Sequence, residues 1–280
     1  MNKLTIYSPK YTPDSKCWRV FTPFGKSWPE EYSLESDGIY RGGIGMFWGF
    51  VGNNERVIRQ YIENDQPWLF SDMPYFGRWN GLKEAVNPEQ DFYWHISLND
   101  IHPTVTKFVT SSDRFDKHGI QIVDERVSGD EIILCPSSET ITRWTYGCSV
   151  KEWIERTTVD IRFHTDRPIR VRHKPRKNGT SGPAAATVPF AEDIKNAYCV
   201  VTSASMGGVE ALINGVPVIQ TAKHGPLPYA KISTIEKVTW DRDNVRGLCN
   251  TLAYHQYSER ELADGTALDI MKDILPLSID

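Results

Sequence analysis

The stretch AYCVVTSASMGGVEALINGVPVI, residues 197–219, carries the pattern that decides the fold of this 280-residue chain. An apolar run over 199–201 predicts a buried parallel strand, and the small residues of 203–208 predict a tight turn that opens a helix. Gly215 ends this helix before Pro217, after which the chain enters a second strand. The stretch therefore predicts a strand–helix–strand unit of a parallel sheet.

The same unit has the features of a phosphate and ribose site. Backbone amides at the start of a helix favour an anion, and small residues allow its close approach. Glu210 follows about one turn into the helix, where its carboxylate can accept hydrogen bonds from sugar hydroxyls. An ordinary crossover, with Ser205 as the N-cap and Glu210 as a solvated acid, is the alternative. The donor-binding candidates of this unit are Ser203, Ser205, Met206, Gly207, Gly208 and Glu210.

A strand rich in basic residues precedes this unit. Residues 167–177 hold six lysines and arginines and no acid. Alternation along a strand puts Arg170, Arg172 and Lys174 on one face. We expect this strand to neighbour the 199–204 strand, so that Arg172 and Lys174 meet a diphosphate at the helix start. An edge strand with solvated charges is the alternative.

The remainder of the second half alternates strands with helices, which predicts a parallel sheet with right-handed crossovers. The expected elements are strands at 131–135 and 169–174, helices opened by Ser149 and Pro189, and a closing helix at about 241–257. His224, in the loop after the last strand of the 197–219 unit, is a further donor-binding candidate. We place the domain boundary between 127 and 128, which gives a first α/β domain over 1–127 and a second domain, with the phosphate and ribose site, over 128–280.

The first half is richer in loops. Its helical spacing at 54–63 and its apolar runs at 67–71 and 91–98 predict a helix and two strands. Asp72 follows one of these strands, at the edge where open α/β sheets bind ligands, which makes it the best-placed base for an acceptor hydroxyl. His95 is a second catalytic candidate. The acid and base candidates of this half are Asp37, Asp72, His95, Asp100 and His102.

Composition narrows the functional classes. A net charge of −4 and a pI near 6.0 argue against a whole-surface nucleic-acid coat, although they are compatible with a local basic groove. Five cysteines without a CxxC pair indicate neither a zinc site nor a disulfide framework and favour a reducing cytoplasm. No apolar run reaches the roughly 20 residues of a membrane span. Walker A, HExxH and GxSxG motifs are absent, which disfavours several common enzyme classes. No cluster of residues has the spacing of metal ligands, so we expect a metal-independent mechanism without a cofactor.

From about residue 130 to 225 the sequence resembles the carboxyl-terminal donor domain of GT-B glycosyltransferases, most closely the capsule-polysaccharide type that includes the β-Kdo transferases. In that family a basic strand ending in His-Pro or Lys-Pro precedes a T-S-x-S-x-G-x-E-A-L-x-x-G-x-P-V element. The matching residues here are Thr202, Ser203, Ser205, Gly207 or Gly208, Glu210, Ala211, Leu212, Gly215, Pro217 and Val218. The resemblance implies an α/β fold of two Rossmann-like domains facing a cleft, with a nucleotide sugar held by the second domain. The turn at 72–78 resembles the corresponding acceptor-domain element.

The function implied by this resemblance is transfer of a sugar from a nucleotide-sugar donor to an acceptor hydroxyl. The compact form is similar to phage enzymes that glycosylate hydroxymethylated pyrimidines, and the basic run with abundant aromatic residues suits a duplex with a flipped base. Double-stranded DNA is therefore the expected acceptor. The alternatives are a surface polysaccharide or glycolipid acceptor, a nucleotide-sugar 2-epimerase, and a non-catalytic nucleotide- or DNA-binding protein.

Overall fold

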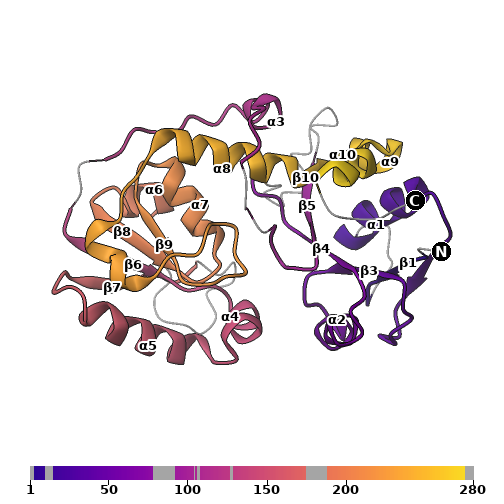
Figure 1. Ribbon diagram of the computed structural model, residues 1–280, viewed down its shortest axis with the longest axis horizontal. Coiled ribbons are helices and arrows are strands. Elements are labelled where there is room, and N and C mark those ends of the chain that lie inside the picture. The colour runs from indigo at the N-terminus through magenta and orange to yellow at the C-terminus, as the bar shows by residue number, and fades with distance from the viewer. Residues whose placement is uncertain are drawn as a thin grey trace. The chain divides into compact units, whose positions relative to one another are not determined.

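A computed structural model describes residues 3–9, 15–77, 92–103, 105, 108–126, 129–174 and 188–274 (Figure 1). The chain divides into two compact units, which we describe separately. Unit 1 comprises Met1–Pro103 and Leu252–Asp280, and unit 2 comprises Thr104–Thr251. The boundary expected from the sequence, at 127 and 128, falls outside the described residues. The division differs from it chiefly because the C-terminal segment returns to unit 1.

Unit 1 is built on a six-stranded sheet in the order β10-β5-β4-β3-β1-β2. Its strands are β1 (Leu4–Tyr7), β2 (Tyr32–Glu35), β3 (Ile44–Trp48), β4 (Trp68–Asp72), β5 (Tyr93–Leu98) and β10 (Gln256–Ser258). Strands β1 to β4 pair in parallel, whereas β5 pairs antiparallel with both β4 and β10. Unit 1 is therefore a mixed sheet that takes its last strand from the C-terminal part of the chain.

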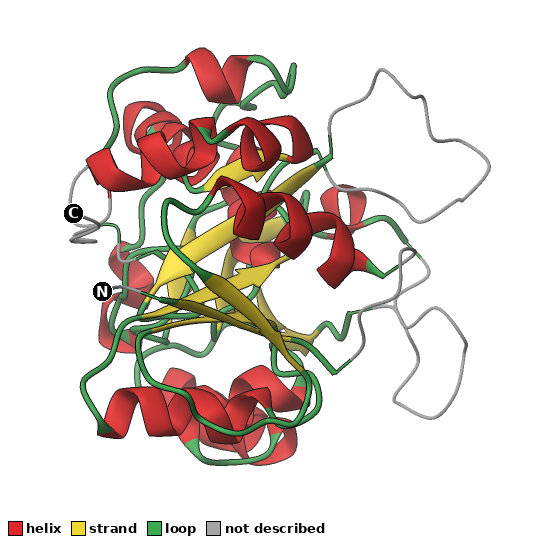
Figure 2. Ribbon diagram, turned by 90° about the vertical axis from the view of Figure 1, so that its right-hand side faces the viewer, coloured by secondary structure: helices red, strands yellow, loops and turns green. Residues whose placement is uncertain are grey.

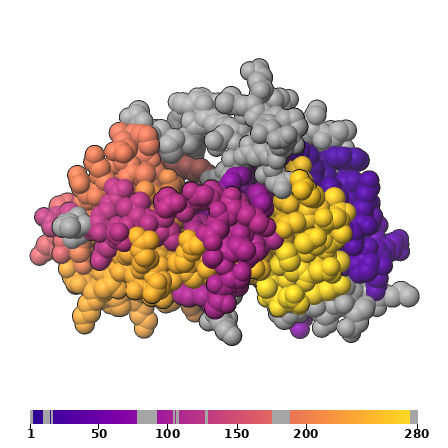
Figure 3. Space-filling view, turned by 90° about the horizontal axis from the view of Figure 1, so that it is seen from above, coloured from indigo at the N-terminus to yellow at the C-terminus, as the bar shows by residue number. Residues whose placement is uncertain are grey.

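Helices lie on both sides of the strands (Figure 2). In unit 1 these are α1 (Lys16–Ser27), α2 (Asn54–Glu63), α9 (Glu259–Asp264) and α10 (Thr266–Ile274). Phe21 of α1 packs in one core with Leu4 of β1 and Met271 of α10. Tyr61 of α2 packs against Tyr7 from the other face of the sheet. Figure 3 shows the C-terminal helices, in yellow, beside the indigo N-terminal segment, which agrees with the packing of α1 on α9.

Unit 2 contains a four-stranded parallel sheet in the order β7-β6-β8-β9. Its strands are β6 (Glu131–Cys135), β7 (Ile169–Val171), β8 (Ala197–Thr202) and β9 (Val218–Gln220). Its helices are α3 (Asp113–Asp116), α4 (Glu139–Tyr146), α5 (Val150–Arg162), α6 (Phe190–Asp193), α7 (Met206–Ile213), the 3-10 helix η1 (Ile232–Lys237) and α8 (Arg242–Tyr254), which crosses into unit 1. One face of the sheet packs against α5 and η1, and the other packs against α6 and α7.

Several expected elements are confirmed. The helix at 54–63, the strand at 131–135 and the strand–helix–strand unit of 197–219 appear with nearly the expected bounds. Ser149 caps α5 in a reciprocal capping box with Glu152. Pro189 is the N-cap of α6 and not its first helical residue. The closing helix was expected to reach 257, but α8 ends at Tyr254 and the chain turns into β10.

Gly215 shows how the end of α7 is fixed. Its φ of +77° is left-handed, and a Cβ there would lie 2.1 Å from the carbonyl oxygen of Asp124. The neighbouring segment pairs with this end of the helix, because Val123 N donates to Ile213 O and Arg126 N donates to Gly215 O. Only glycine combines this backbone conformation with so close an approach. The sequence signal that ended the predicted helix at Gly215 is thus confirmed in physical terms.

Within the residues that the structure describes, no helix has both the length and the apolar character needed to cross a membrane.

Candidate functional site

The strand order of unit 2 reverses between β6 and β8. From β6 the chain crosses to β7 on one side, and it then returns to β8 on the other side of β6 (Figure 1). Open α/β sheets bind ligands outside the carboxyl ends of their strands at such a switch point. The loops that leave β6 and β8 are residues 136–138 and 203–205. The topology therefore points to the same loop that the sequence motif singled out.

Serine side chains tie these two loops together. Ser203 Oγ donates to Ser137 Oγ at 2.7 Å and accepts from the Ser137 amide at 3.0 Å, while the Ala204 amide donates to Ser137 Oγ at 3.1 Å. At the ends of the two strands, Thr202 Oγ1 of β8 donates to the Cys135 carbonyl of β6 at 2.9 Å. Ser203 is completely buried. We conclude that Ser203 holds the loops in place, and that its hydroxyl does not face solvent.

One of the two glycines at the start of α7 is not tightly packed. Ser205 Oγ caps the helix by accepting from the Gly207 amide at 3.2 Å. A Cβ at Gly208 would lie 2.7 Å from Leu227 Cδ1, so this glycine is required for packing. A Cβ at Gly207 would meet nothing nearer than 3.5 Å, where the closest side chain of another element is Phe190. A ligand can therefore approach the first turn of α7 at Gly207.

The other donor-binding candidates lie around this edge of the sheet. Glu210 is an exposed residue of α7, one turn after the half-buried Met206. His224 is exposed in the loop that follows β9, and Lys174 is exposed three residues beyond β7. Because parallel strands end at a common edge, all four follow carboxyl ends of the unit 2 sheet.

Sequence reasoning missed Gln220, which shapes the loop carrying His224. Its amide nitrogen donates to the carbonyl of Ala222 at 3.0 Å, and its carbonyl oxygen accepts from the Leu227 amide at 3.0 Å. A Cβ at Gly225 would lie 2.4 Å from the Gln220 side chain. The only signal in the sequence is a glutamine at the end of an apolar strand, followed by a loop rich in glycine and proline.

The prediction of which strand lies beside the basic strand is wrong. We expected it to lie beside the 199–204 strand, but β6 separates β7 from β8. The reason is non-local, because the crossover through α5 carries the chain to the outer side of β6. The strand is also shorter than expected and ends at Val171. Arg176, Lys177 and most of the loop after them lie outside the described residues.

Arg170 and Arg172 are held by acids of unit 2. Arg172 is 6% exposed, its Nε lies 2.5 Å from Asp193 Oδ2, and its Nη2 donates to the carbonyl of Val188 at 3.0 Å. Arg170 lies 3.1 Å from Asp193 and 3.0 Å from Glu131. Burial opposes ionisation of Asp193, but hydrogen bonds from both arginines outweigh it and lower the pKa of this carboxyl. Both guanidinium groups therefore anchor β7 to α6.

In unit 1 the two catalytic candidates lie on adjacent strands. Asp72, the last residue of β4, is paired in register with His95 of β5. Asp72 Oδ1 accepts from the amide of Met73 at 2.7 Å, and its side chain is half-buried. Arg78, which we expected in the same turn, lies outside the described residues.

His95 is only 2% exposed, and both of its ring nitrogens face backbone carbonyls. Nδ1 lies 2.7 Å from Met73 O and Nε2 lies 3.2 Å from Ile101 O. Tyr75, whose hydroxyl lies 3.0 Å from His102 Nδ1, packs against the same ring. This geometry is typical of a histidine that fixes loops. One of these loops is the turn that carries Asp72.

The described residues contain no cluster of three or more His, Cys, Asp or Glu arranged to hold a metal ion. The five cysteines are buried free thiols. Burial raises the pKa of Cys135, Cys199 and Cys249 to about 12. These thiols are therefore protonated near neutral pH and serve as small packing groups.

No known family model matches the sequence, and no curated protein matches it. Among solved structures, the chain is similar to KpsC of Thermosulfurimonas dismutans described as a beta Kdo 2,7 transferase, with a TM-score of 0.51 and 13% identity over 95% of this chain and 99% of that one. A second structure of KpsC, described as a beta Kdo 2,4 transferase, has a TM-score of 0.45 and 11% identity over 89% and 90%. The first likeness shows the fold, a mixed α/β architecture with parallel sheets.

Proposed function

We propose that this chain is a glycosyltransferase that moves a sugar from a nucleotide-sugar donor to an acceptor hydroxyl. The observation that carries the proposal is the switch point of unit 2, where α7 begins with an approachable turn at Gly207. The first amides of α7 would neutralise the diphosphate leaving group, because a helix start presents N–H donors and a partial positive charge. Glu210, exposed one turn later, would accept hydrogen bonds from the ribose.

The remaining roles follow from exposure. Lys174 and His224 are exposed at the same edge of the sheet and are assigned to donor contact. Arg172 is buried against Asp193, so we assign it to positioning α6 and not to the phosphates. In the GT-B arrangement, two Rossmann-like domains face a cleft, and Asp72 of the first would deprotonate the acceptor hydroxyl without a metal ion. We place the reaction in the cytoplasm.

A saccharide is a better acceptor than DNA for this chain. Three arginines of the basic run that suggested a duplex are paired with acids of unit 2, and among them Arg167 lies 3.0 Å from Glu236 and 3.1 Å from Asp130. Arg170 and Arg172 are paired in the same way. A protein that binds duplex DNA needs cations available to phosphates. The similar KpsC structure is described as a Kdo transferase, and we therefore propose a surface polysaccharide or glycolipid as acceptor.

Gly207→Asp and Gly207→Asn test the donor site as a matched pair. A Cβ at Gly207 meets its neighbours only at ordinary contact distance, and the two side chains are nearly the same size but differ in charge. An acid in the first turn stabilises a helix, so the aspartate variant is expected to fold. Its carboxylate would repel a bound diphosphate, and we expect affinity for nucleoside diphosphates to fall about tenfold more than in the asparagine variant. Isothermal titration calorimetry measures this difference, and equal affinities would contradict the phosphate site.

Turnover distinguishes the activities. Incubation with a panel of nucleotide sugars should release nucleoside diphosphate or monophosphate only when a saccharide acceptor is present. Turnover with hydroxymethylated DNA in its place would restore the DNA acceptor. Conversion of the donor without any acceptor would identify a nucleotide-sugar 2-epimerase, and binding without turnover would identify a binding protein.

A further inference from the structure

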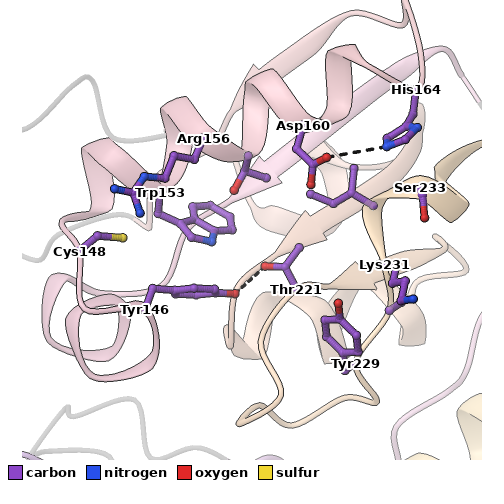
Figure 4. Close-up of a pocket in the computed structure, with 13 residues that line it drawn as sticks. Tyr146, Cys148, Trp153, Arg156, Asp160, His164, Thr221, Tyr229, Lys231 and Ser233 are labelled. Carbon is purple, nitrogen blue, oxygen red and sulfur yellow. Dashed lines mark hydrogen bonds and ion pairs between the residues drawn. The ribbon is translucent and has the colours of Figure 1, made fainter.

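A cavity of about 450 Å³ lies in unit 2 between α5 and the segment 229–233 (Figure 4). It is on the sheet face that packs against α5 and η1, whereas α7 packs on the opposite face. Its volume is within the range of about 300–1,000 Å³ that is typical of small-molecule pockets. None of the residues assigned above to donor binding lines it.

Three aromatic side chains line this cavity. Trp153 projects from α5 toward Tyr146, and their ring centroids are 6.3 Å apart (Figure 4). Trp153 is buried, and the Tyr146 hydroxyl is fixed by a 2.6 Å hydrogen bond with Thr221 Oγ1. Tyr229, on the facing loop, is 48% exposed. The cavity thus has two fixed aromatic side chains and one at its mouth, which suits a flat ring system.

Charged side chains complete the lining. Arg156 and Lys231 are exposed residues of the cavity lining. Arg156 lies one turn after Glu152, whose pKa is lowered by hydrogen bonds from Ser149 and also by the charge of Arg156. Asp160 is the acid of the cavity, and its Oδ1 lies 3.7 Å from His164 Nε2. Two exposed cations in the lining favour an anionic group on the ligand. Asp160 offers an acceptor for a ring amino or imino group.

We propose that this cavity binds a nucleoside monophosphate at a site separate from the start of α7. The base would stack among the three aromatic side chains, and the phosphate would contact Arg156 and Lys231. Aromatic walls, hydrogen-bonding groups and two exposed cations together match this class of ligand, which carries a flat polar ring and a phosphate. The inference does not depend on sugar transfer, because it uses none of the residues of the donor site.

The test uses the full-length Gly207→Asp variant, in which phosphate binding at the start of α7 should be weakened, and titrates it with AMP, GMP, CMP and UMP by calorimetry. We expect at least one of them to bind with one site per chain. Adding Tyr229→Ala should weaken that binding about tenfold through the loss of stacking. Adding Arg156→Ala should weaken it about tenfold through the loss of a charge-assisted contact.

Lys151→Ala is the matched control. Lys151 is an exposed cation of the same helix that does not line the cavity, so its removal should leave the affinity within about twofold. Tyr229 and Arg156 are exposed, and unchanged thermal melting of each variant shows that it is folded. If no monophosphate binds in the Gly207→Asp background, or if Tyr229→Ala and Arg156→Ala bind like Lys151→Ala, the cavity is not a nucleotide site. Either result leaves the proposed transferase activity standing.

Discussion

Replacing Arg172 with methionine is expected to lower the free energy of unfolding by about 3 kcal/mol, because it removes the buried member of an ion pair and leaves the Asp193 carboxylate less well compensated. The guanidinium is 6% exposed and contacts the Asp193 carboxylate and the Val188 carbonyl. It also lies over the Phe190 ring, 4.7 Å from its centroid. Without it, the more exposed Arg170 is the ion-pair partner that remains for Asp193 among the residues that the structure describes. Urea denaturation followed by circular dichroism measures the change.

Arg170→Met is the matched control, because it removes the same group, also paired with Asp193, from a position two residues earlier in the chain. Arg170 is 38% exposed, so its replacement should cost about 1 kcal/mol or less. The double variant Arg172→Met with Asp193→Leu removes both buried charges and should recover most of the lost stability. Equal losses for the two arginines would show that burial does not determine the strength of this contact.

The double variant also separates positioning from donor contact. If Arg172 acts by anchoring α6, restoring stability with Asp193→Leu should restore affinity for nucleoside diphosphates. If Arg172 contacts the phosphates, the affinity should stay low in a chain that is again stable. The comparison therefore decides between the role inferred from burial and the role first inferred from the basic strand.

Local signals explain what the sequence predicted well. Ser149 and Glu152 form a capping box within four consecutive residues, and Gly215 marks the end of α7 through its own φ. The strand–helix–strand unit that carries Ser205 and Glu210 likewise depends on contacts between neighbours in the chain. These features are encoded in short windows, so they can be read without knowing the tertiary structure.

The strand order could not be read in this way. Nothing near 169–171 shows that β7 pairs with β6 and not with β8, because that choice depends on where the α5 crossover delivers the chain. Both arginines pair with Asp193, which lies about twenty residues later in the sequence. The sequence therefore predicted the cluster of basic residues, but it did not predict that Arg170 and Arg172 pair with Asp193.

Unit 1 was harder to predict because its strands lack alternation. Strand β3 is buried at all five positions, and a Cβ at Gly45 would lie 2.7 Å from the rings of Phe47 and Tyr61. Helix α1 contains Pro23, and proline inside a helix weakens the sequence signal for one. The strand at 256–258 continues the apolar spacing of α8, and only its pairing with β5 makes it a strand.

Acidification is expected to destabilise the protein through His255, by about 2 kcal/mol between pH 7 and pH 5. Burial, and secondarily the charge of His95, lowers the pKa of His255 from 6.5 to about 4. Its Nδ1 has no hydrogen-bond partner among the described residues. The unfolded chain takes up a proton near pH 6.5, whereas the folded chain takes it up only near pH 4. The free energy of unfolding therefore falls as the pH drops from about 6.5 toward 4. Above this range the folded and unfolded chains are both neutral at His255, and no stability is lost.

The variant His255→Leu removes this titration while keeping an apolar side chain of similar size. Its stability should change less than that of the wild type between pH 7 and pH 5, and the difference between the two proteins should narrow as the pH falls. Urea denaturation at several pH values measures both curves, and an NMR titration of the His255 ring reports its pKa directly. Parallel stability curves, or a ring that titrates near pH 6.5 in the folded protein, would show that water reaches His255 and that its burial carries no cost.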